Sequence, residues 1–414
     1  MRPPSESSVP PAILIALSCM FLVLNLSGFL TVGAVLPALI DSWHLSNTEA
    51  GWLGAIYFAG YVSSVLILVP LTDRVSPKRI YQTASLVGAL AAIGFAFLAV
   101  DFWSGLVLRF FAGVALAGAY MPALKALADT LEERWRSRAM SYYASTFAIG
   151  TALSLYAGGA IADVSGWETS FAAAGAGHFI AFLIGLFCLP AGRHDPSPGV
   201  GRLLIDFRPV LRNRAALAYI LAYGGHMWEV FTIRIWLVVY LGWIAARDAG
   251  GMFASPVAVA SIVALIGVPF AMWFGEIASR GNRRNRVLYS IYAAAAALGF
   301  FVVFGPSLGM GADAIAVIVI LYGGAIYADT GTVTAGMALR AEPSMRGATM
   351  AVHAFTGFFG AMAGPALAGV VLDLAGGRES PAAWIGAWMV AVSGGLFAAA
   401  SLRFVGRARD KTAR

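Results

Sequence analysis

The chain has 414 residues, of which 59% are hydrophobic and only 12% are charged. A soluble globular protein carries about 25% charged residues. A soluble core could not hide this much apolar surface, so lipid must cover part of it. The net charge of +7 is spread between apolar segments and forms no long basic arm. This pattern favours membrane topology over nucleic-acid binding, and no nucleic-acid partner is expected.

Twelve apolar segments are long enough to cross a bilayer, which requires about 20 mostly apolar residues. The first six are 12–40, 50–71, 80–100, 104–127, 139–162 and 169–190. The last six are 215–243, 254–276, 286–305, 313–338, 346–373 and 382–404. The expected fold is an all-α membrane protein with twelve transmembrane helices in two pseudo-symmetric six-helix bundles. The bundles are predicted at 12–191 and 215–404, with a cytoplasmic linker at 192–214.

The distribution of Lys and Arg residues predicts the orientation. With the N-terminus placed in the cytoplasm, 23 of the 28 basic residues fall in inner loops and tails. Only Arg247 and Arg378 fall in outer loops. Because cytoplasmic loops carry an excess of Lys and Arg, we expect a bacterial inner-membrane protein with its tails, 1–11 and 405–414, in the cytoplasm. Cys19 and Cys188 lie inside apolar runs without metal-ligand spacing, so no metal or cofactor is expected.

The two halves of the chain resemble each other. The loop at 69–79, between spans two and three, corresponds to the loop at 275–284, between spans eight and nine. Spans five and eleven also align at a constant offset, which places Gly150 opposite Gly360 and Asp163 opposite Asp373. Such duplication is typical of transporters that rock one half against the other around a central site.

The first of these loops resembles the loop motif of the major facilitator superfamily, Gly-x-Leu-Ala-Asp-Arg-x-Gly-Arg-Lys. The residues that carry the resemblance are Leu71, Asp73, Arg74 and Lys78, and in the second copy Gly275, Arg280, Arg283 and Arg284. The first copy departs with Val69, Ser76 and Pro77, and the second has Ser279 in place of the Asp. In span four, the segment from Leu106 to Gly113 resembles the Arg-bearing motif of the same family, with Arg109 as its arginine. The resemblance implies a secondary transporter that acts as a monomer.

The loop motif is predicted to control conformation rather than to bind substrate. Asp73 follows span two at its cytoplasmic end, where a carboxylate can accept hydrogen bonds from a helix N-terminus and from arginine side chains. Such a contact could hold the halves together in one state and break in the other. The predicted latch residues are Asp73, Arg74, Lys78, Arg280, Arg283 and Arg284.

Ionisable groups at membrane depth are costly and are therefore candidates for function. His226 and Glu229 share a face of span seven, and Arg234 lies about two turns beyond His226. Asp329 in span ten and His353 in span eleven are expected near them. Since carboxylate and imidazole groups together suit a proton relay, we predict proton coupling at Glu229, Asp329, His226 and His353. The alternative is a static buried network that fixes helix packing.

Two arginines are candidates for holding an anionic solute, because a guanidinium binds a carboxylate in a bidentate way. They are Arg109 and Arg234, and in the alternative interpretation Glu229 or Asp329 neutralises them. His178 is interpreted as an isolated packing residue. The other residues predicted to line the substrate cavity are Asn25, Tyr57, Tyr61, Tyr142, Tyr143, Ser145 and Trp228.

The favoured function is secondary active transport of a small organic solute, with anions as the candidate class, by alternating access and proton coupling. The first alternative is proton-driven efflux of drugs or metabolites. Span five lacks the Gly-Pro motif of the superfamily's drug antiporters, although span eleven contains Gly364-Pro365. A membrane enzyme is disfavoured because the sequence has no phosphate-binding loop, no Gly-x-Ser-x-Gly and no paired metal ligands. A non-transporting receptor or assembly factor is the remaining alternative.

Overall fold

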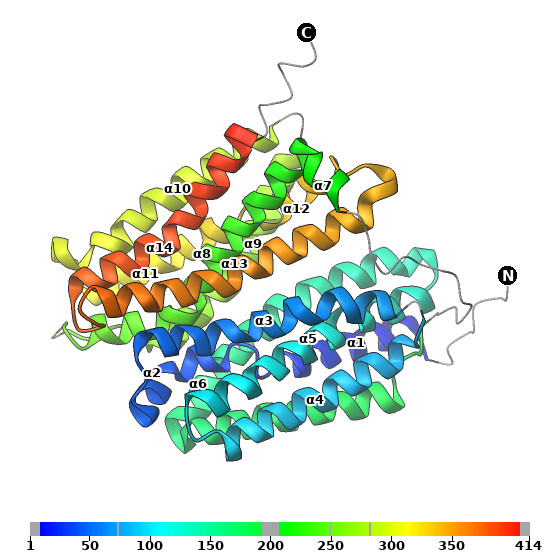
Figure 1. Ribbon diagram of the computed structural model, residues 1–414, viewed down its shortest axis with the longest axis horizontal. Helices are drawn as coiled ribbons and strands as arrows, with labels where there is room; N and C mark the ends of the chain where they lie inside the picture. The colour runs from blue at the N-terminus through cyan, green and yellow to red at the C-terminus, as the bar shows by residue number, and fades with distance from the viewer. Residues whose placement is uncertain (1–8, 73, 193–206, 249, 281–282, 406–414) are drawn as a thin grey trace, which may run out of the picture. The chain divides into compact units, whose positions relative to one another are not determined.

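The computed structural model describes residues 9–72, 74–192, 207–248, 250–280 and 283–405. Every regular element in these ranges is a helix, which confirms the predicted all-α fold (Figure 1). The predicted latch residue Asp73, the tails at 1–8 and 406–414, and most of the predicted linker, 193–206, lie outside the described residues.

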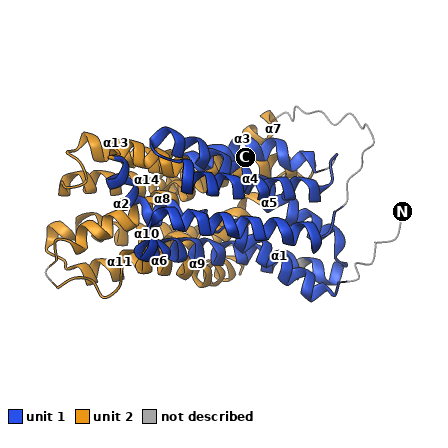
Figure 2. Cartoon of the chain, turned by 90° about the horizontal axis from the view of Figure 1, so that it is seen from below, with its two compact units in different colours: residues 1–43, 56–200 blue, residues 44–55, 201–414 orange. Residues whose placement is uncertain are grey.

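The chain divides into two compact units, which Figure 2 shows in two colours. Unit 1 comprises residues 1–43 and 56–200. Its helices are α1 (Pro11–Asn25), α2 (Thr31–Trp43), most of α3 (Asn47–Leu71), α4 (Pro77–Leu98), α5 (Phe102–Thr130) and α6 (Glu133–Phe187).

Unit 2 comprises residues 44–55 and 201–414 and therefore includes the first turns of α3. Its other α-helices are α7 (Arg208–Arg212), α8 (Arg214–Ala245), α9 (Pro256–Ser279), α10 (Arg284–Phe304), α11 (Ala312–Tyr327), α12 (Thr330–Ala338), α13 (Arg346–Leu374) and α14 (Pro381–Ala400). Short 3₁₀ turns lie at Pro306–Leu308 and Pro343–Met345, and a π-helical turn at Ser401–Val405 follows α14.

Ten helices of the described part are long and apolar enough to cross a membrane. One of them, α6, has 55 residues and contains both predicted spans five and six. The two spans meet at Gly166, whose φ of +84° is a conformation that glycine adopts without strain. The predicted loop between these spans is therefore reduced to a single non-helical residue.

The predicted first span, 12–40, is wrong as a continuous helix. The chain leaves the helix after Asn25 and resumes it at Thr31. Ser154 of α6 holds this break: its hydroxyl accepts from the Leu30 N–H at 3.1 Å and donates to the Ser27 carbonyl at 2.8 Å. Irregular backbone at membrane depth is tolerated where protein groups satisfy it, and here the groups come from a distant helix.

In span ten, α11 ends at Tyr327 and α12 begins at Thr330. The two residues between them, Ala328 and Asp329, keep right-handed helical dihedral angles, so Ala312–Ala338 forms one span. Asp329 therefore lies at the junction of two helical segments of that span.

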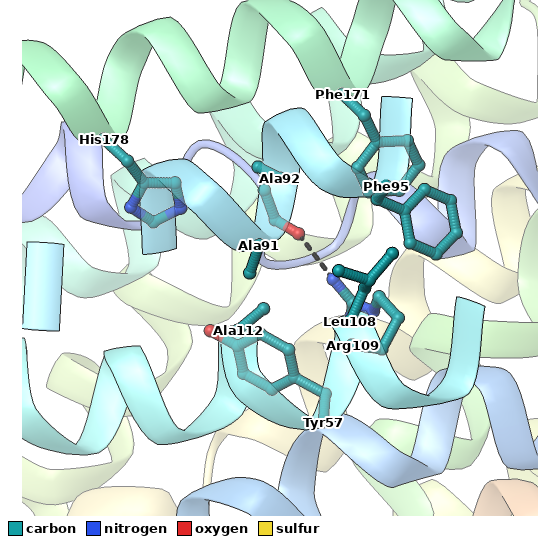
Figure 3. Close-up of a pocket in the computed structure, with 10 residues that line it drawn as sticks. Tyr57, Ala91, Ala92, Phe95, Leu108, Arg109, Ala112, Phe171 and His178 are labelled. Atoms are coloured by element: carbon teal, nitrogen blue, oxygen red, sulfur yellow. Dashed lines mark hydrogen bonds between the residues drawn. The ribbon is translucent and has the colours of Figure 1, made fainter. Parts of the chain in front are cut away.

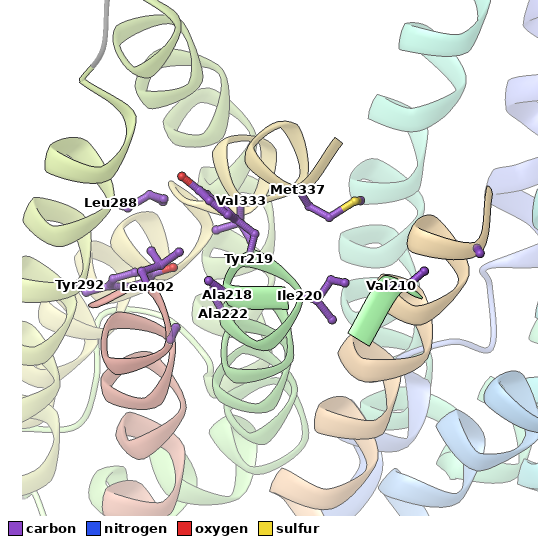
Figure 4. Packing of buried hydrophobic residues seen from close by; sticks show 12 residues of the cluster. Val210, Ala218, Tyr219, Ile220, Ala222, Leu288, Tyr292, Val333, Met337 and Leu402 are labelled. Carbon is purple, nitrogen blue, oxygen red and sulfur yellow. The ribbon is translucent and has the colours of Figure 1, made fainter. Parts of the chain in front are cut away.

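Helix α8 is the central helix of unit 2. In its most apolar stretch 89% of the residues are buried, against 33% in α9. Glycines allow this close packing, since Gly360 of α13 lies against the Gly224 carbonyl and Gly394 of α14 against the Gly225 carbonyl. An apolar cluster that includes Tyr219, Leu288 and Met337 packs around one end of α8 (Figure 4). Polar side chains on α8 are consequently held inside the helix bundle.

Candidate functional site

The centre of the candidate site is a buried pair in unit 2. His226 on α8 is 3% exposed, and Asp329, at the junction before α12, is 1% exposed. The Nδ1 atom of His226 lies 2.6 Å from Oδ1 of Asp329. That oxygen has no aligned hydrogen bond, so the contact is mainly electrostatic. A protonated His226 would neutralise the Asp329 carboxylate within the bundle.

Glu229 lies one turn from His226 on α8 and is 4% exposed. Its Oε1 accepts a hydrogen bond from the Tyr322 hydroxyl of α11. No Lys, Arg or His of the described residues forms an ion pair with it. An unpaired buried charge is strongly unfavourable, and such a group takes up a proton instead. Glu229 is therefore the carboxyl of this cluster that has to be neutral in this conformation.

His353 extends the cluster from α8 to α13. The Tyr223 ring stacks on the His353 ring at 4.0 Å and on the His226 ring at 5.8 Å between centroids. Thr330 Oγ1 lies 3.3 Å from Nε2 of His226, and Thr334 Oγ1 lies 3.3 Å from Nε2 of His353. Polar and aromatic groups thus form a continuous path between the two imidazoles.

Among the described residues, Tyr327 connects Arg234 to the cluster. The Arg234 Nε donates to the Tyr327 hydroxyl at 2.5 Å, and its guanidinium lies over the Phe231 and Tyr327 rings at 4.9 and 5.0 Å. Of the five groups predicted to cluster, the structure places His226 and Asp329 as a pair, with Glu229 and His353 beside them. Neutralisation of Arg234 by Glu229 or Asp329 is wrong, because none of the described carboxylates pairs with it.

Arg109 occupies a separate position, in the interior of unit 1 (Figure 3). It is 3% exposed, and its two terminal nitrogens donate to the carbonyls of Gly28 and Phe29, in the break of the first span, at 2.9 and 3.1 Å. The guanidinium also lies 4.6 Å from the centre of the Tyr57 ring. No described carboxylate forms an ion pair with it, so Arg109 in this conformation stabilises the broken helix.

A small cavity lies beside Arg109. Tyr57, Phe95, Phe171 and His178 contribute to its lining, and it has room for about one water molecule. His178 is not isolated as predicted, because its Nδ1 lies 3.3 Å from Oδ1 of Asn25. Arg109, His178 and Asn25 therefore belong to one buried polar region in unit 1.

The remaining predicted lining residues differ in exposure. Tyr61 and Tyr143 are buried, and the Tyr143 hydroxyl donates to the Tyr120 carbonyl at 3.2 Å. Tyr142 and Ser145 are exposed on α6. On α8, Trp228 donates through Nε1 to the Val390 carbonyl at 2.7 Å. These contacts are compatible with packing and do not by themselves define a substrate.

The predicted latch residues form local contacts. The Nζ atom of Lys78 donates to the Leu189 carbonyl at 3.0 Å, and Arg280 pairs with Glu276 at 3.1 Å on an exposed surface. Arg283 immediately precedes α10, and Arg284 has a buried Nε without a partner. Because Asp73 lies outside the described residues, the proposed conformational role of this loop stays a prediction.

Sequence reasoning missed the groups that connect the cluster, namely Tyr223, Tyr322, Thr330 and Thr334. Tyr322 lies two turns before Asp329, a spacing that could have indicated a shared helix face. No signal in the sequence indicated the two threonines, because their orientation depends on the junction between α11 and α12. Among the described residues no group of three or more potential metal ligands occurs.

Long apolar helices with ionisable groups buried inside a helix bundle define, by class, a polytopic membrane protein. The chain belongs to the Major Facilitator Superfamily, whose family model matches residues 14–337. The chain is therefore a multi-pass membrane protein of this family.

Curated relatives match only part of the chain. The uncharacterized MFS-type transporter YcaD of Escherichia fergusonii is 33% identical over 138 residues, 32% of this chain and 36% of that protein. The uncharacterized MFS-type transporter Ent638_1421 of Enterobacter sp. strain 638 is 32% identical over 124 residues, 29% of this chain and 32% of that protein. This chain thus aligns with about a third of the length of these relatives.

Solved structures match over nearly the whole chain. A bacterial homolog of the human lysosomal transporter Spinster, in an inward-facing and unoccupied conformation, has a TM-score of 0.78 at 17% identity and covers 98% of each chain. The nucleoside transporter NupG has a TM-score of 0.74 at 14% identity and covers 96% of this chain and 99% of its own. At these identities the likeness shows the fold alone.

Proposed function

We propose that this chain is a proton-coupled transporter of a small organic solute, with organic anions as the candidate class. It would act as a monomer in the bacterial inner membrane, with both termini in the cytoplasm, and alternate access between its two bundles. The observation that supports this proposal most is the pair of buried carboxyls in unit 2. Asp329 has His226 as its partner, whereas the described groups that hydrogen-bond to Glu229 are neutral, namely the Tyr322 hydroxyl and the Gly395 backbone.

The two carboxyls have different roles in this proposal. The His226–Asp329 pair can stay ionised without a net charge, so it can persist through the cycle. None of the described cations pairs with Glu229, so it binds a proton while it is buried and can release one only when water or a cation reaches it. Proton exchange at Glu229 would thereby follow the change of access.

Arg234 supports the choice of an anionic solute. Its two terminal nitrogens have no hydrogen-bond partner among the described residues, and its side chain is only partly buried. A guanidinium with free donors can bind a carboxylate or phosphate. A neutral solute such as a nucleoside, the class for which the transporter NupG is named, serves as the contrasting class in the test.

The test begins with a thermal-shift screen of the purified protein against monocarboxylates, dicarboxylates, sugar phosphates and nucleosides. The ligand that stabilises the protein is then used in proteoliposome uptake with an imposed pH gradient. We expect the gradient to drive flux in the native protein and Glu229→Gln to abolish that dependence. The matched control, Glu168→Gln, changes an exposed carboxyl of unit 1. Uptake by this variant should still depend on the pH gradient. Gradient-driven flux that survives in Glu229→Gln would refute the proton site.

A further inference from the structure

Asp373, near the C-terminal end of α13, binds the N-terminus of α3. Its Oδ1 accepts from the Asn47 N–H at 3.1 Å and from Asn47 Nδ2 at 2.7 Å. Its Oδ2 accepts from the Thr48 N–H at 2.7 Å and from the Thr48 hydroxyl at 2.6 Å. One carboxylate thus accepts four hydrogen bonds from the first turn of α3, and all of these residues lie in unit 2.

This contact is not needed to start helix α3. Ser46 and Glu49 already form a local cap, in which the Glu49 N–H donates to Ser46 Oγ at 3.2 Å and the Ser46 N–H donates to Glu49 Oε2 at 2.9 Å. It also does not stabilise α13, because a carboxylate at a helix C-terminus interacts unfavourably with the dipole of its own helix. The four hydrogen bonds therefore serve the docking of α3 on α13.

Glycines bring the two helix backbones together at the same place. A Cβ on Gly51 of α3 would lie 2.6 Å from the Pro365 carbonyl, and a Cβ on Gly369 of α13 would contact the Asn47 carbonyl. The first turns of α3 are therefore held on α13 by close packing of the two backbones and by the Asp373 carboxylate. The remainder of α3 belongs to unit 1, so this helix is shared by both units.

The internal repeat provides a comparison. Asp163 of α6 corresponds to Asp373 in the sequence repeat, but it is exposed and has no hydrogen-bond partner among the described residues. The start of α9, which Ser255 caps through the Ala258 N–H, has Pro256 at its first position and so lacks one free N–H there. Among the described residues, the carboxylate contact is thus present in one half of the repeat and absent from the other.

We propose that Asp373 is a reversible latch that holds the first turns of α3 on α13 in one conformation and releases them during the transport cycle. Asp373 is exposed, so water can replace its hydrogen bonds when the helix ends separate. The latch lies at the opposite end of α3 from the loop that contains Asp73 and Arg74, and it is independent of the proton site. Its release would alternate with that of the predicted loop latch.

Cysteine labelling tests the latch without a known substrate. Ala50 lies in the docked turns and is fully buried, so Ala50→Cys reports their separation from α13. The variant is made in a background with Cys19→Ser and Cys188→Ser, and a maleimide labels the purified protein in nanodiscs. We expect Asp373→Asn to raise the labelling rate about ten-fold, the effect of losing roughly one charge-assisted hydrogen bond. Asp163→Asn is the matched control and should leave the rate unchanged.

A second arm locks the latch. The Thr48→Cys and Asp373→Cys pair places two thiols where the hydroxyl and carboxylate now meet. Oxidation to the disulfide should stop exchange of the bound ligand found in the screen, and reduction should restore it. The latch proposal is wrong if the disulfide forms fully and the bound ligand still exchanges. It is also wrong if Ala50→Cys is labelled at the parent rate in both the Asp373→Asn and the milder Thr48→Ala backgrounds. These outcomes leave proton coupling at Glu229 untouched, since neither variant alters the unit 2 cluster.

Discussion

Adding one methyl group at Gly395 should displace Glu229 from its hydrogen bond. A Cβ at this position of α14 would lie 2.5 Å from Oε2 of Glu229, whereas ordinary contacts begin at 3.4 Å. The carboxyl must therefore move by about 0.9 Å, which weakens its hydrogen bond with the Tyr322 hydroxyl. Leaving a buried polar group without its partner costs about 1–3 kcal/mol.

The assay for Gly395→Ala combines thermal unfolding with the pH profile of uptake. We expect Tm to fall by a few degrees and the pH dependence to weaken. Gly331→Ala is the matched control, because no atom lies within 4 Å of the added Cβ. The effects of Gly395→Ala and Tyr322→Phe should also be less than additive, since both act on one hydrogen bond. Equal behaviour of Gly395→Ala and Gly331→Ala in both measurements would refute the reasoning.

Three further predictions concern groups outside this cluster. Hydrogen bonds from Ser104 hold the pKa of Asp101 below its usual range. The ionised cap therefore stabilises the fold at a pH above the pKa of Asp101 in the unfolded chain, and this stabilisation is lost as the pH falls through the pKa of Asp101 in the folded protein. Asp101→Ala should therefore lower Tm at neutral pH but not at strongly acidic pH. The Ala312 N–H likewise lowers the pKa of Asp248, so Asp248→Asn should lower Tm at neutral pH and lose its effect in acid. Arg109→Lys gives up one of two carbonyl contacts and should reduce the free energy of unfolding by roughly 1.5–3 kcal/mol, as measured by denaturant unfolding in detergent.

Much of the fold follows from apolar length and charge distribution. Apolar length predicted the all-α class and most of the spans, and the internal sequence repeat predicted two related halves. The spacing of His226 and Glu229 predicted that they share one face of α8. The count of residues along span ten predicted that Asp329 lies at a similar depth.

The breaks in the helices could not be predicted from local sequence. The first span is interrupted because Ser154 and Arg109 satisfy its free backbone groups, and these residues lie 124 and about 80 positions away. The same limit applies to Asp373, whose partners Asn47 and Thr48 are more than 320 residues distant. Such contacts depend on tertiary structure, and no local pattern indicates them.

The most direct measurement is infrared spectroscopy of the purified protein at neutral pH, because it detects the carbonyl stretch of a protonated carboxylic acid without any substrate. We predict that this band is present in the native protein, absent in Glu229→Gln and retained in Asp329→Asn. A band that persists in Glu229→Gln, or disappears only in Asp329→Asn, would contradict the assignment of the exchangeable proton to Glu229.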